Sequence, residues 1–118
     1  MSNLKQQLEA SAAGILATAQ QSTDPKTQFC TLWNGTIKPT LELVKNFTGP
    51  KIDNLINELE TAADGICNGS NPDQKNFCNI WNSFHLEFIL KGIEIFVGPN
   101  VKKVISKFIE IADSLCAA

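Results

Sequence analysis

Arginine and tyrosine are absent from this 118-residue sequence, and histidine occurs once, as His85. All ten basic residues are therefore lysines, which lack the planar fork by which arginine grips phosphates and bases. The missing tyrosines also remove a common stacking surface for bases. We expect no nucleic-acid partner. Because His85 stands alone and no spacing typical of metal ligands occurs, we expect no metal site.

Sequence patterns of catalytic sites are also missing. The chain has no glycine-rich phosphate loop and no nucleophile motif. Its closest pair of glutamates, Glu58 and Glu60, is two positions apart, and residues at this spacing do not face each other on a helix. We therefore predict a protein that is not an enzyme and needs no cofactor.

The sequence also lacks long apolar runs and alternating apolar patterns. No run is long and apolar enough to cross a bilayer, and no segment alternates with period two as a half-buried strand would. Apolar residues recur instead at helical spacing along most of the chain. With 43% hydrophobic residues and a net charge of −2, the sequence predicts an all-α fold in one domain, residues 1–118.

What the chain does contain is a duplication. Three motifs occur twice in the same order: FCTLWN at 29–34 and FCNIWN at 77–82, Gly-Pro at 49–50 and 98–99, and ADGIC at 63–67 and ADSLC at 112–116. Glycine after a helix and proline at the start of the next are typical of a tight turn. We predict a helix at about 3–21 followed by two helical hairpins, at about 25–67 and 72–116. This is a five-helix bundle with up-down topology.

The four cysteines lie at matching places in the two copies. In each copy, nearly equal numbers of residues separate the Gly-Pro turn from the cysteine before it and the cysteine after it, so antiparallel arms bring both to one height. We therefore predict disulfides Cys30–Cys67 and Cys78–Cys116, although four cysteines allow three pairings. Each bridge would contribute about 4 kcal/mol to stability in the chain-entropy model.

Two further features predict a secreted glycoprotein. Paired cysteines are typical of an oxidising compartment. Three glycosylation sequons occur, at Asn34-Gly35-Thr36, Asn46-Phe47-Thr48 and Asn68-Gly69-Ser70. The start Met1-Ser2-Asn3 lacks the apolar stretch of a signal peptide, so we expect that such a peptide is not part of this sequence.

The second copy is more apolar than the first along its first arm. Aligned at the Gly-Pro pairs, Phe88, Ile89 and Ile95 replace Pro39, Thr40 and Asn46, and Phe84 lies near Thr36. A helix that is apolar on most sides must be buried on most sides or contact a ligand, a partner or lipid. The N-terminal helix could cover this second stripe; otherwise the stripe lines a cavity or an interface. Pro39 is expected to kink the first arm and open space between the hairpins.

Our leading hypothesis is a non-catalytic protein that binds a hydrophobic small ligand, such as a fatty acid or another lipid, between its hairpins. The apolar residues expected to contact this ligand are Trp33, Trp81, Phe84, Phe88, Ile89 and Ile95. The two tryptophans also suit the core of their hairpins. Lys102 and Lys103 lie in the first turn of a predicted helix, where the dipole disfavours cations, so we place an anionic head group near them. A solvated charge cluster is the alternative.

A protein-interaction factor is the alternative function: a secreted effector, a cytokine-like ligand or a structural secretion component. In that case Phe84, Phe88 and Ile95 form an interface with another protein or with a second copy of the chain. Membrane contact through Phe96, Val97 and nearby lysines would be at most transient.

Overall fold

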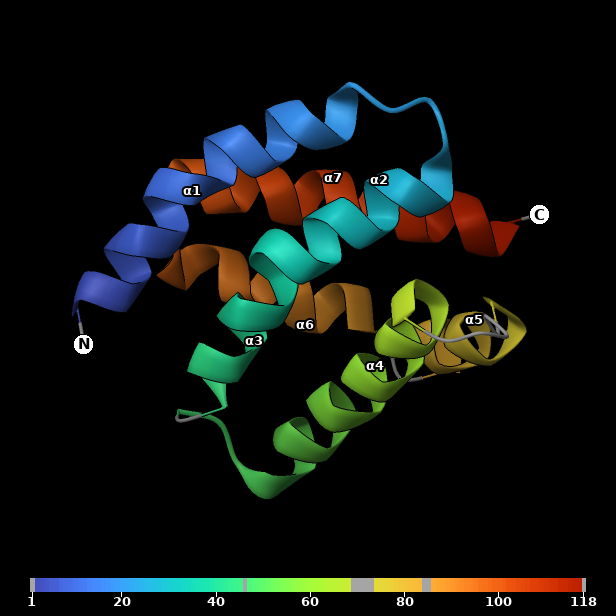
Figure 1. The fold of residues 1–118 in the computed structure, drawn as a ribbon. Coiled ribbons are helices and arrows are strands. Elements are labelled where there is room, and N and C mark those ends of the chain that lie inside the picture. Colours follow the sequence, from blue (N-terminus) through green and yellow to red (C-terminus); the bar gives the residue numbers. More distant parts are fainter. Residues whose placement is uncertain (1, 46, 69–73, 84–85, 118) are drawn as a thin grey trace.

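The structure is a computed structural model that describes residues 2–45, 47–68, 74–83 and 86–117 (Figure 1). The described residues are almost entirely helical and contain no strand, so the all-α prediction is confirmed. In chain order the elements are α1 (Ser2–Gln20), α2 (Pro25–Leu32), the π-helix η1 (Trp33–Ile37), α3 (Lys38–Val44), α4 (Pro50–Asn68), α5 (Gln74–Ser83), α6 (Leu86–Ile93), the 3-10 helix η2 (Glu94–Phe96) and α7 (Pro99–Ala117). This is more than the five helices predicted. The first arm of each predicted hairpin is divided, into α2, η1 and α3 in one case and into α5, α6 and η2 in the other.

The first of these divisions lies just before Pro39. In η1 the backbone N–H of Lys38 donates to the carbonyl oxygen of Trp33, five residues back. Proline has no N–H, and in a regular helix its ring collides with the carbonyl four residues before it. The wider π turn ends at Ile37, directly before the helix that contains Pro39 near its start. The expected disturbance by Pro39 therefore takes the form of a π segment.

The second division separates α5, which ends at Ser83, from α6, which begins at Leu86. Phe84 and His85 lie outside the described residues. The last turn of this arm tightens into η2, and Val97 leaves the helix with extended backbone angles, φ −120° and ψ 165°.

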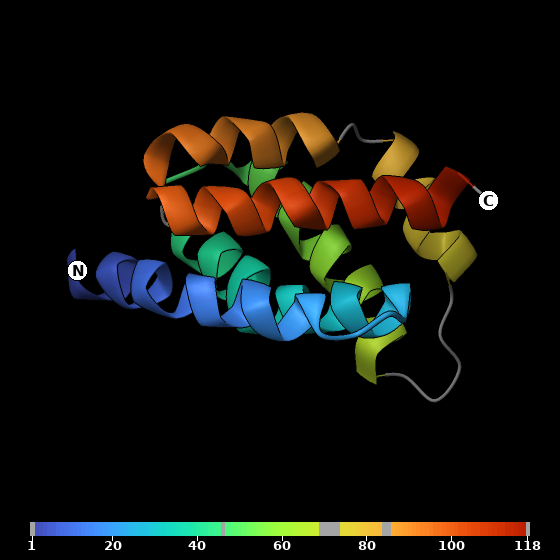
Figure 2. The same ribbon diagram turned by 90° about the horizontal axis from the view of Figure 1, so that it is seen from above.

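Helix α7 runs through the centre of the molecule, with α1 beside it and α6 returning along it in the opposite direction (Figures 1 and 2). The core around α7 is aromatic. Phe108 of α7 lies 4.9 Å from Phe29, 5.9 Å from Trp33 and 6.2 Å from Trp81, measured between ring centroids. Phe29 also meets Phe77 edge to face at 5.1 Å. One core thus joins residues from both halves of the sequence.

The same two links occur in residues 25–68 and in residues 74–117. Disulfides join Cys30 to Cys67 and Cys78 to Cys116, with Cα atoms 5.4 and 5.2 Å apart, which is the predicted pairing. In addition, the indole N–H of Trp33 donates to Asp64 at 2.9 Å, and that of Trp81 donates to Asp113 at 2.8 Å. These hydrogen bonds satisfy the only polar atom of each buried indole.

Helix α1 is fixed to the start of α7 by Glu9. Its carboxylate accepts hydrogen bonds from the backbone N–H groups of Asn100, at 2.7 Å, and Val101, at 3.1 Å. These groups lie in the first turn of a helix, where N–H groups lack partners and negative charge is favoured. Gly98 allows this approach, because a Cβ at that position would overlap the Glu9 carboxylate.

Candidate ligand-binding pocket

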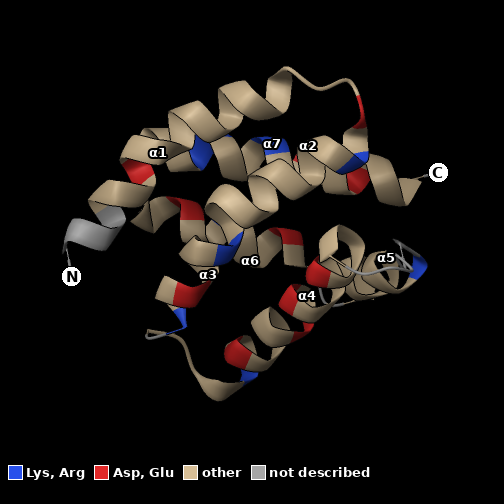
Figure 3. Cartoon of the chain, in the orientation of Figure 1, with Lys and Arg blue, Asp and Glu red and all other residues tan. Residues whose placement is uncertain are grey.

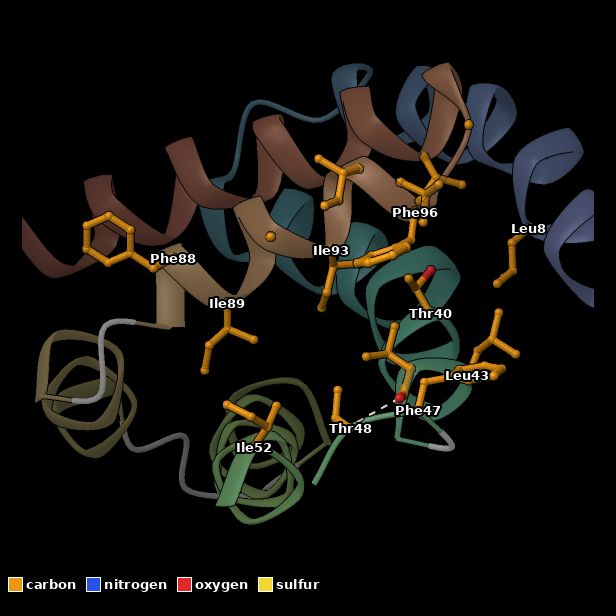
Figure 4. Close-up of a pocket in the computed structure, with 16 residues that line it drawn as sticks. Leu8, Thr40, Leu43, Phe47, Thr48, Ile52, Phe88, Ile89, Ile93 and Phe96 are labelled. Carbon is orange, nitrogen blue, oxygen red and sulfur yellow. Dashed lines mark hydrogen bonds between the residues drawn. The ribbon is translucent and has the colours of Figure 1, made fainter. Parts of the chain in front are cut away.

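An apolar cavity of about 800 Å³ opens between α3 and α6 (Figure 4). The first wall comes from α3, the turn after it and the start of α4: Thr40, Leu43, Val44, Phe47, Thr48 and Ile52. The second wall comes from α6, η2, the turn after it and the start of α7: Ile89, Gly92, Ile93, Phe96, Val97 and Val101. Leu8, Phe88, Ile95 and Gly98 complete the lining. This volume lies within the range of small-molecule sites, about 300–1,000 Å³.

The two walls consist of positions that match when the Gly-Pro pairs at 49–50 and 98–99 are aligned. Every residue of the first wall has its counterpart in the second at the offset that separates Gly49 from Gly98. Thr40 thus corresponds to Ile89, and Phe47 to Phe96. The pocket therefore has an approximate internal symmetry in sequence, although its chemistry differs from wall to wall.

The polar side chains of the lining are confined to the first wall. Among the described lining residues none is charged, and the only hydroxyl groups belong to Thr40 and Thr48. Thr48 is occupied, because its Oγ1 bonds to the Asp53 carboxylate. Thr40 is only 2% exposed, and its Oγ1 has no hydrogen-bond partner in the described part of the chain. The second wall is wholly apolar.

The mouth of the pocket is rimmed by exposed apolar side chains. Phe47 is 83% exposed, Phe88 72%, Ile95 79% and Phe96 67%. Single exposed apolar residues are ordinary, but a group around one opening marks a binding surface. The rim therefore extends the apolar lining to the outside of the molecule.

A charge cluster with one buried member, Glu60, links two elements of the first wall, α3 and α4. Charged residues lie along α4 and near the end of α3 (Figure 3), where Lys45 forms ion pairs with Glu60 of α4 and with Glu42, the latter at 3.3 Å. Glu60 is buried, and this burial raises its pKa; the nearby Glu42 raises it further, against the lowering effect of Lys45. The cluster ties α3 to α4.

Three of the residues predicted to bind a ligand lie at this pocket: Phe88, Ile89 and Ile95. Phe84 is outside the described residues. Helix α1 does not cover the second stripe, because it contributes only Leu8 to the described lining and Phe88 and Ile95 remain exposed.

Trp33 and Trp81 are in a different place from the pocket. Both are buried, at 0% and 3% exposure, and both stack or pack on aromatic residues of the core. Neither is among the described residues that line the pocket. They lie in the core, which the sequence analysis named as the alternative to the ligand site.

Lys102 and Lys103 are exposed and lie outside the described pocket lining. The sequence did not predict that the Glu9 carboxylate caps the start of α7, the helix to which both lysines belong. Its negative charge offsets the unfavourable interaction of first-turn cations with the helix dipole. A ligand head group is thus unnecessary to explain them.

The sequence reasoning missed the apolar residues of the first wall, among them Leu43, Phe47 and Ile52. A signal was present for two of them, because Phe47 and Ile52 are the counterparts of Phe96 and Val101 in the second copy. Most of the lining occupies positions that match between the two copies, so differences between the copies do not reveal it.

The predicted sugar-attachment sites lie away from the core where they can be placed. Asn34 and Asn68 are exposed. Asn46 lies outside the described residues, as do Gly69 and Ser70 of the third sequon.

No protein-family model matches the chain, and no curated protein or solved structure is significantly similar to it. Within the described ranges, no group of three or more His, Cys, Asp or Glu side chains is placed to hold a metal ion. None of the helices, as far as they are described, has the length and apolar character needed to span a membrane.

Proposed function

We propose that this protein is a non-catalytic carrier of a small hydrophobic ligand, a fatty acid or another lipid, held in the cavity between α3 and α6. The observation that supports this most is the combination of size and lining: about 800 Å³, with no charged side chain among the described lining residues. Pockets that bind small molecules are mostly apolar, with a few placed polar groups. Thr40 and Thr48 are the polar residues of the described lining.

The pocket can be explained by the repeated motifs of the chain. We propose that the two halves of the chain are duplicated disulfide-closed hairpins and that the ligand lies between equivalent arms. The matching disulfides, the matching tryptophan–aspartate hydrogen bonds and the paired wall positions support this.

We also propose that the protein is secreted and glycosylated. Two disulfides support an oxidising compartment, and the exposed Asn34 and Asn68 offer attachment sites on the surface. Mass spectrometry after expression in a secreting eukaryotic cell line tests both statements, because each occupied sequon adds a sugar mass that an amidase removes.

Ligand binding is tested with the delipidated protein. A neutral fluorescent probe, N-phenyl-1-naphthylamine, is titrated in, and native mass spectrometry is run before and after delipidation. We expect saturable probe binding at one site per chain and displacement of the probe by medium-chain lipids. If the probe does not bind and no lipid mass accompanies the native protein, the proposed carrier function is wrong.

The exposed rim favours a second function, binding to another protein or to a second copy of the chain through Phe88 and Ile95. Sedimentation velocity over a hundredfold concentration range tests the self-association. A dimer that Phe88→Ser dissociates would support this function, and a monomer at all concentrations would exclude self-association.

A further inference from the structure

Two turns at one end of the molecule carry exposed aromatic side chains. Phe47 lies in the turn between α3 and α4, and Phe96 ends η2, directly before the turn into α7. We call them the Gly-Pro turns, after the pairs at 49–50 and 98–99; both lie toward the left in Figures 1 and 2. The two phenylalanines are 83% and 67% exposed, and they line the pocket from opposite walls (Figure 4). An exposed ring therefore flanks the mouth of the pocket on each side.

Exposed lysines follow both Gly-Pro turns. Lys51 lies in the first turn of α4, and Lys102 and Lys103 lie near the start of α7. The backbone N–H of Lys102 donates to the carbonyl oxygen of Gly98, a lining residue of the pocket, at 3.0 Å. None of the three lysines forms an ion pair with a described residue. Lysines beside exposed apolar side chains are typical of surfaces that contact the headgroups and outer acyl chains of a bilayer.

The acidic residues near the Gly-Pro turns are engaged within the protein. The carboxylate of Glu9 accepts from two N–H groups at the start of α7, that of Asp53 from a threonine hydroxyl, and that of Glu94 from a serine hydroxyl at 3.1 Å. All three residues are half-buried. The exposed Glu42 is paired with Lys45 at 3.3 Å. The charges beside the mouth that are exposed and unpaired among the described residues are therefore the three lysines.

The opposite end of the molecule has a different surface. It contains α5 and the start of α2, to the right in Figure 1. The large apolar residues that are exposed in the described part of the chain all line the pocket, so this end has none of them. Its exposed charges include Asp24, Glu110 and Asp113 as well as Lys26 and Lys75. An anionic surface therefore attracts the end with the Gly-Pro turns more than the opposite end.

We propose that the Gly-Pro turns dock this protein reversibly on an anionic phospholipid bilayer, with Phe47 and Phe96 in the interface and Lys51, Lys102 and Lys103 at the level of the phosphates. The pocket then opens onto the bilayer, where a lipid can enter it without crossing water. This inference goes beyond the carrier function and does not require it, because docking uses only the outer surface of the turns.

The test measures co-sedimentation of the whole protein with vesicles of phosphatidylcholine alone or of three parts phosphatidylcholine and one part phosphatidylglycerol. We expect binding to the anionic vesicles to be at least tenfold tighter than binding to the neutral ones, because each lysine near an anionic surface adds about fivefold. We also expect this binding to weaken from about 50 to about 500 mM NaCl, since salt screens the attraction. No binding to the anionic vesicles, or equal binding to both kinds, would show the proposal to be wrong.

Three double variants locate the docking surface. Phe47→Ser with Phe96→Ser should bind anionic vesicles at least tenfold more weakly, because two apolar side chains no longer enter the interface. Lys102→Ala with Lys103→Ala should bind about twentyfold more weakly.

The matched control is Lys26→Ala with Lys75→Ala, which removes the same charge from exposed positions at the opposite end. We expect it to bind as wild type does. Circular dichroism checks that each variant is folded.

The remaining outcomes contradict the inference without touching the carrier function. If the control loses as much affinity as the Lys102 and Lys103 variant, or if the phenylalanine variant binds as wild type does, the Gly-Pro turns are not the docking surface. If the protein ignores vesicles but forms a dimer that the phenylalanine variant dissociates, a second copy occupies this surface. Probe binding to the pocket is measured separately, so a protein that docks but binds no probe loses the carrier function alone.

Discussion

The two walls of the pocket come from equivalent positions of the sequence but differ in what supports them and in what they present. Behind the first wall, Lys45 and the buried Glu60 join α3 to α4. The second wall is apolar on its pocket side, and the ion pair described on its helix α6 joins Lys91 to Glu87 at 3.2 Å within the same helix. Links shared by both halves, the disulfides and the tryptophan–aspartate bonds, lie away from the pocket. The disulfides and the tryptophan–aspartate bonds, which both halves share, thus hold the helices together, whereas the positions that differ between the walls determine what the pocket can bind.

Removing the disulfides tests whether the two bridges stabilise the protein equally. It has the largest expected effect on stability. The bridges close loops of nearly equal length, with sequence separations of 37 and 38. We therefore expect Cys30→Ala with Cys67→Ala, and Cys78→Ala with Cys116→Ala, each to lower the free energy of unfolding by about 4 kcal/mol. Urea unfolding followed by circular dichroism measures both. A difference of about 2 kcal/mol or more between the two double variants would contradict the prediction that both disulfides contribute equally.

The aspartates that bond to the two tryptophans differ in their other partners and in their exposure. Asp64 accepts hydrogen bonds from Trp33 and from Lys38, whose Nζ lies 2.8 Å away, while Asp113 has Trp81 as its described side-chain donor. We expect Asp64→Ala to cost about 2 kcal/mol, because it leaves a buried indole N–H unsatisfied. Asp113→Ala should cost less, since Asp113 is exposed and water can reach its place. Urea midpoints measure both, and equal costs would contradict this reasoning.

Glu9 of α1 caps the start of α7, although α1 precedes both halves in the sequence. We expect Glu9→Ala to lower the free energy of unfolding by about 1 kcal/mol, because two first-turn N–H groups lose their acceptor. Glu58→Ala, at an exposed position of α4, is the control and should leave thermal unfolding unchanged. A control that loses as much stability would show that the effect is one of overall charge.

The smallest expected effect is a dependence on pH in the first half. Burial alone would raise the pKa of Asp64, but hydrogen bonds from Lys38 and Trp33 outweigh it and lower the pKa. A carboxyl group with a lowered pKa in the folded state stabilises the protein above its ordinary pKa, about 3.9, and this stabilisation is lost as pH falls below it. The stability gap between wild type and Asp64→Asn should therefore shrink from pH 6 to pH 3. A constant gap contradicts this assignment.

The helical character of the chain and the pairing of its cysteines could be predicted from the sequence. Repeated motifs and equal arm lengths predict the helices and both disulfide pairs, because helix rise fixes where the cysteines meet. The helix count was not predictable in the same way. The division at η1 depends on how the chain accommodates Pro39, and a π turn and a kink are both compatible with one proline.

The pocket was predicted only on the side formed by α6 and η2. Phe88, Ile89 and Ile95 were found because they are unexpectedly apolar, whereas Val44 and Ile52 look like ordinary core residues of an amphipathic helix. Their place in the lining depends on how far α3 lies from α6, which sequence periodicity does not contain. The Glu9 cap joins residues 91 positions apart and has no local signal either.

The most direct test of the proposed ligand site fills the cavity from a position that has room for a side chain. Gly92 lines the second wall, and a Cβ there meets nothing within 4 Å; the same is true of Gly14 on α1, away from the pocket. We predict that Gly92→Phe abolishes saturable binding of N-phenyl-1-naphthylamine, while Gly14→Phe binds it as wild type does, with both variants folded by circular dichroism. Unchanged probe affinity in a folded Gly92→Phe protein would contradict the claim that this cavity binds the ligand.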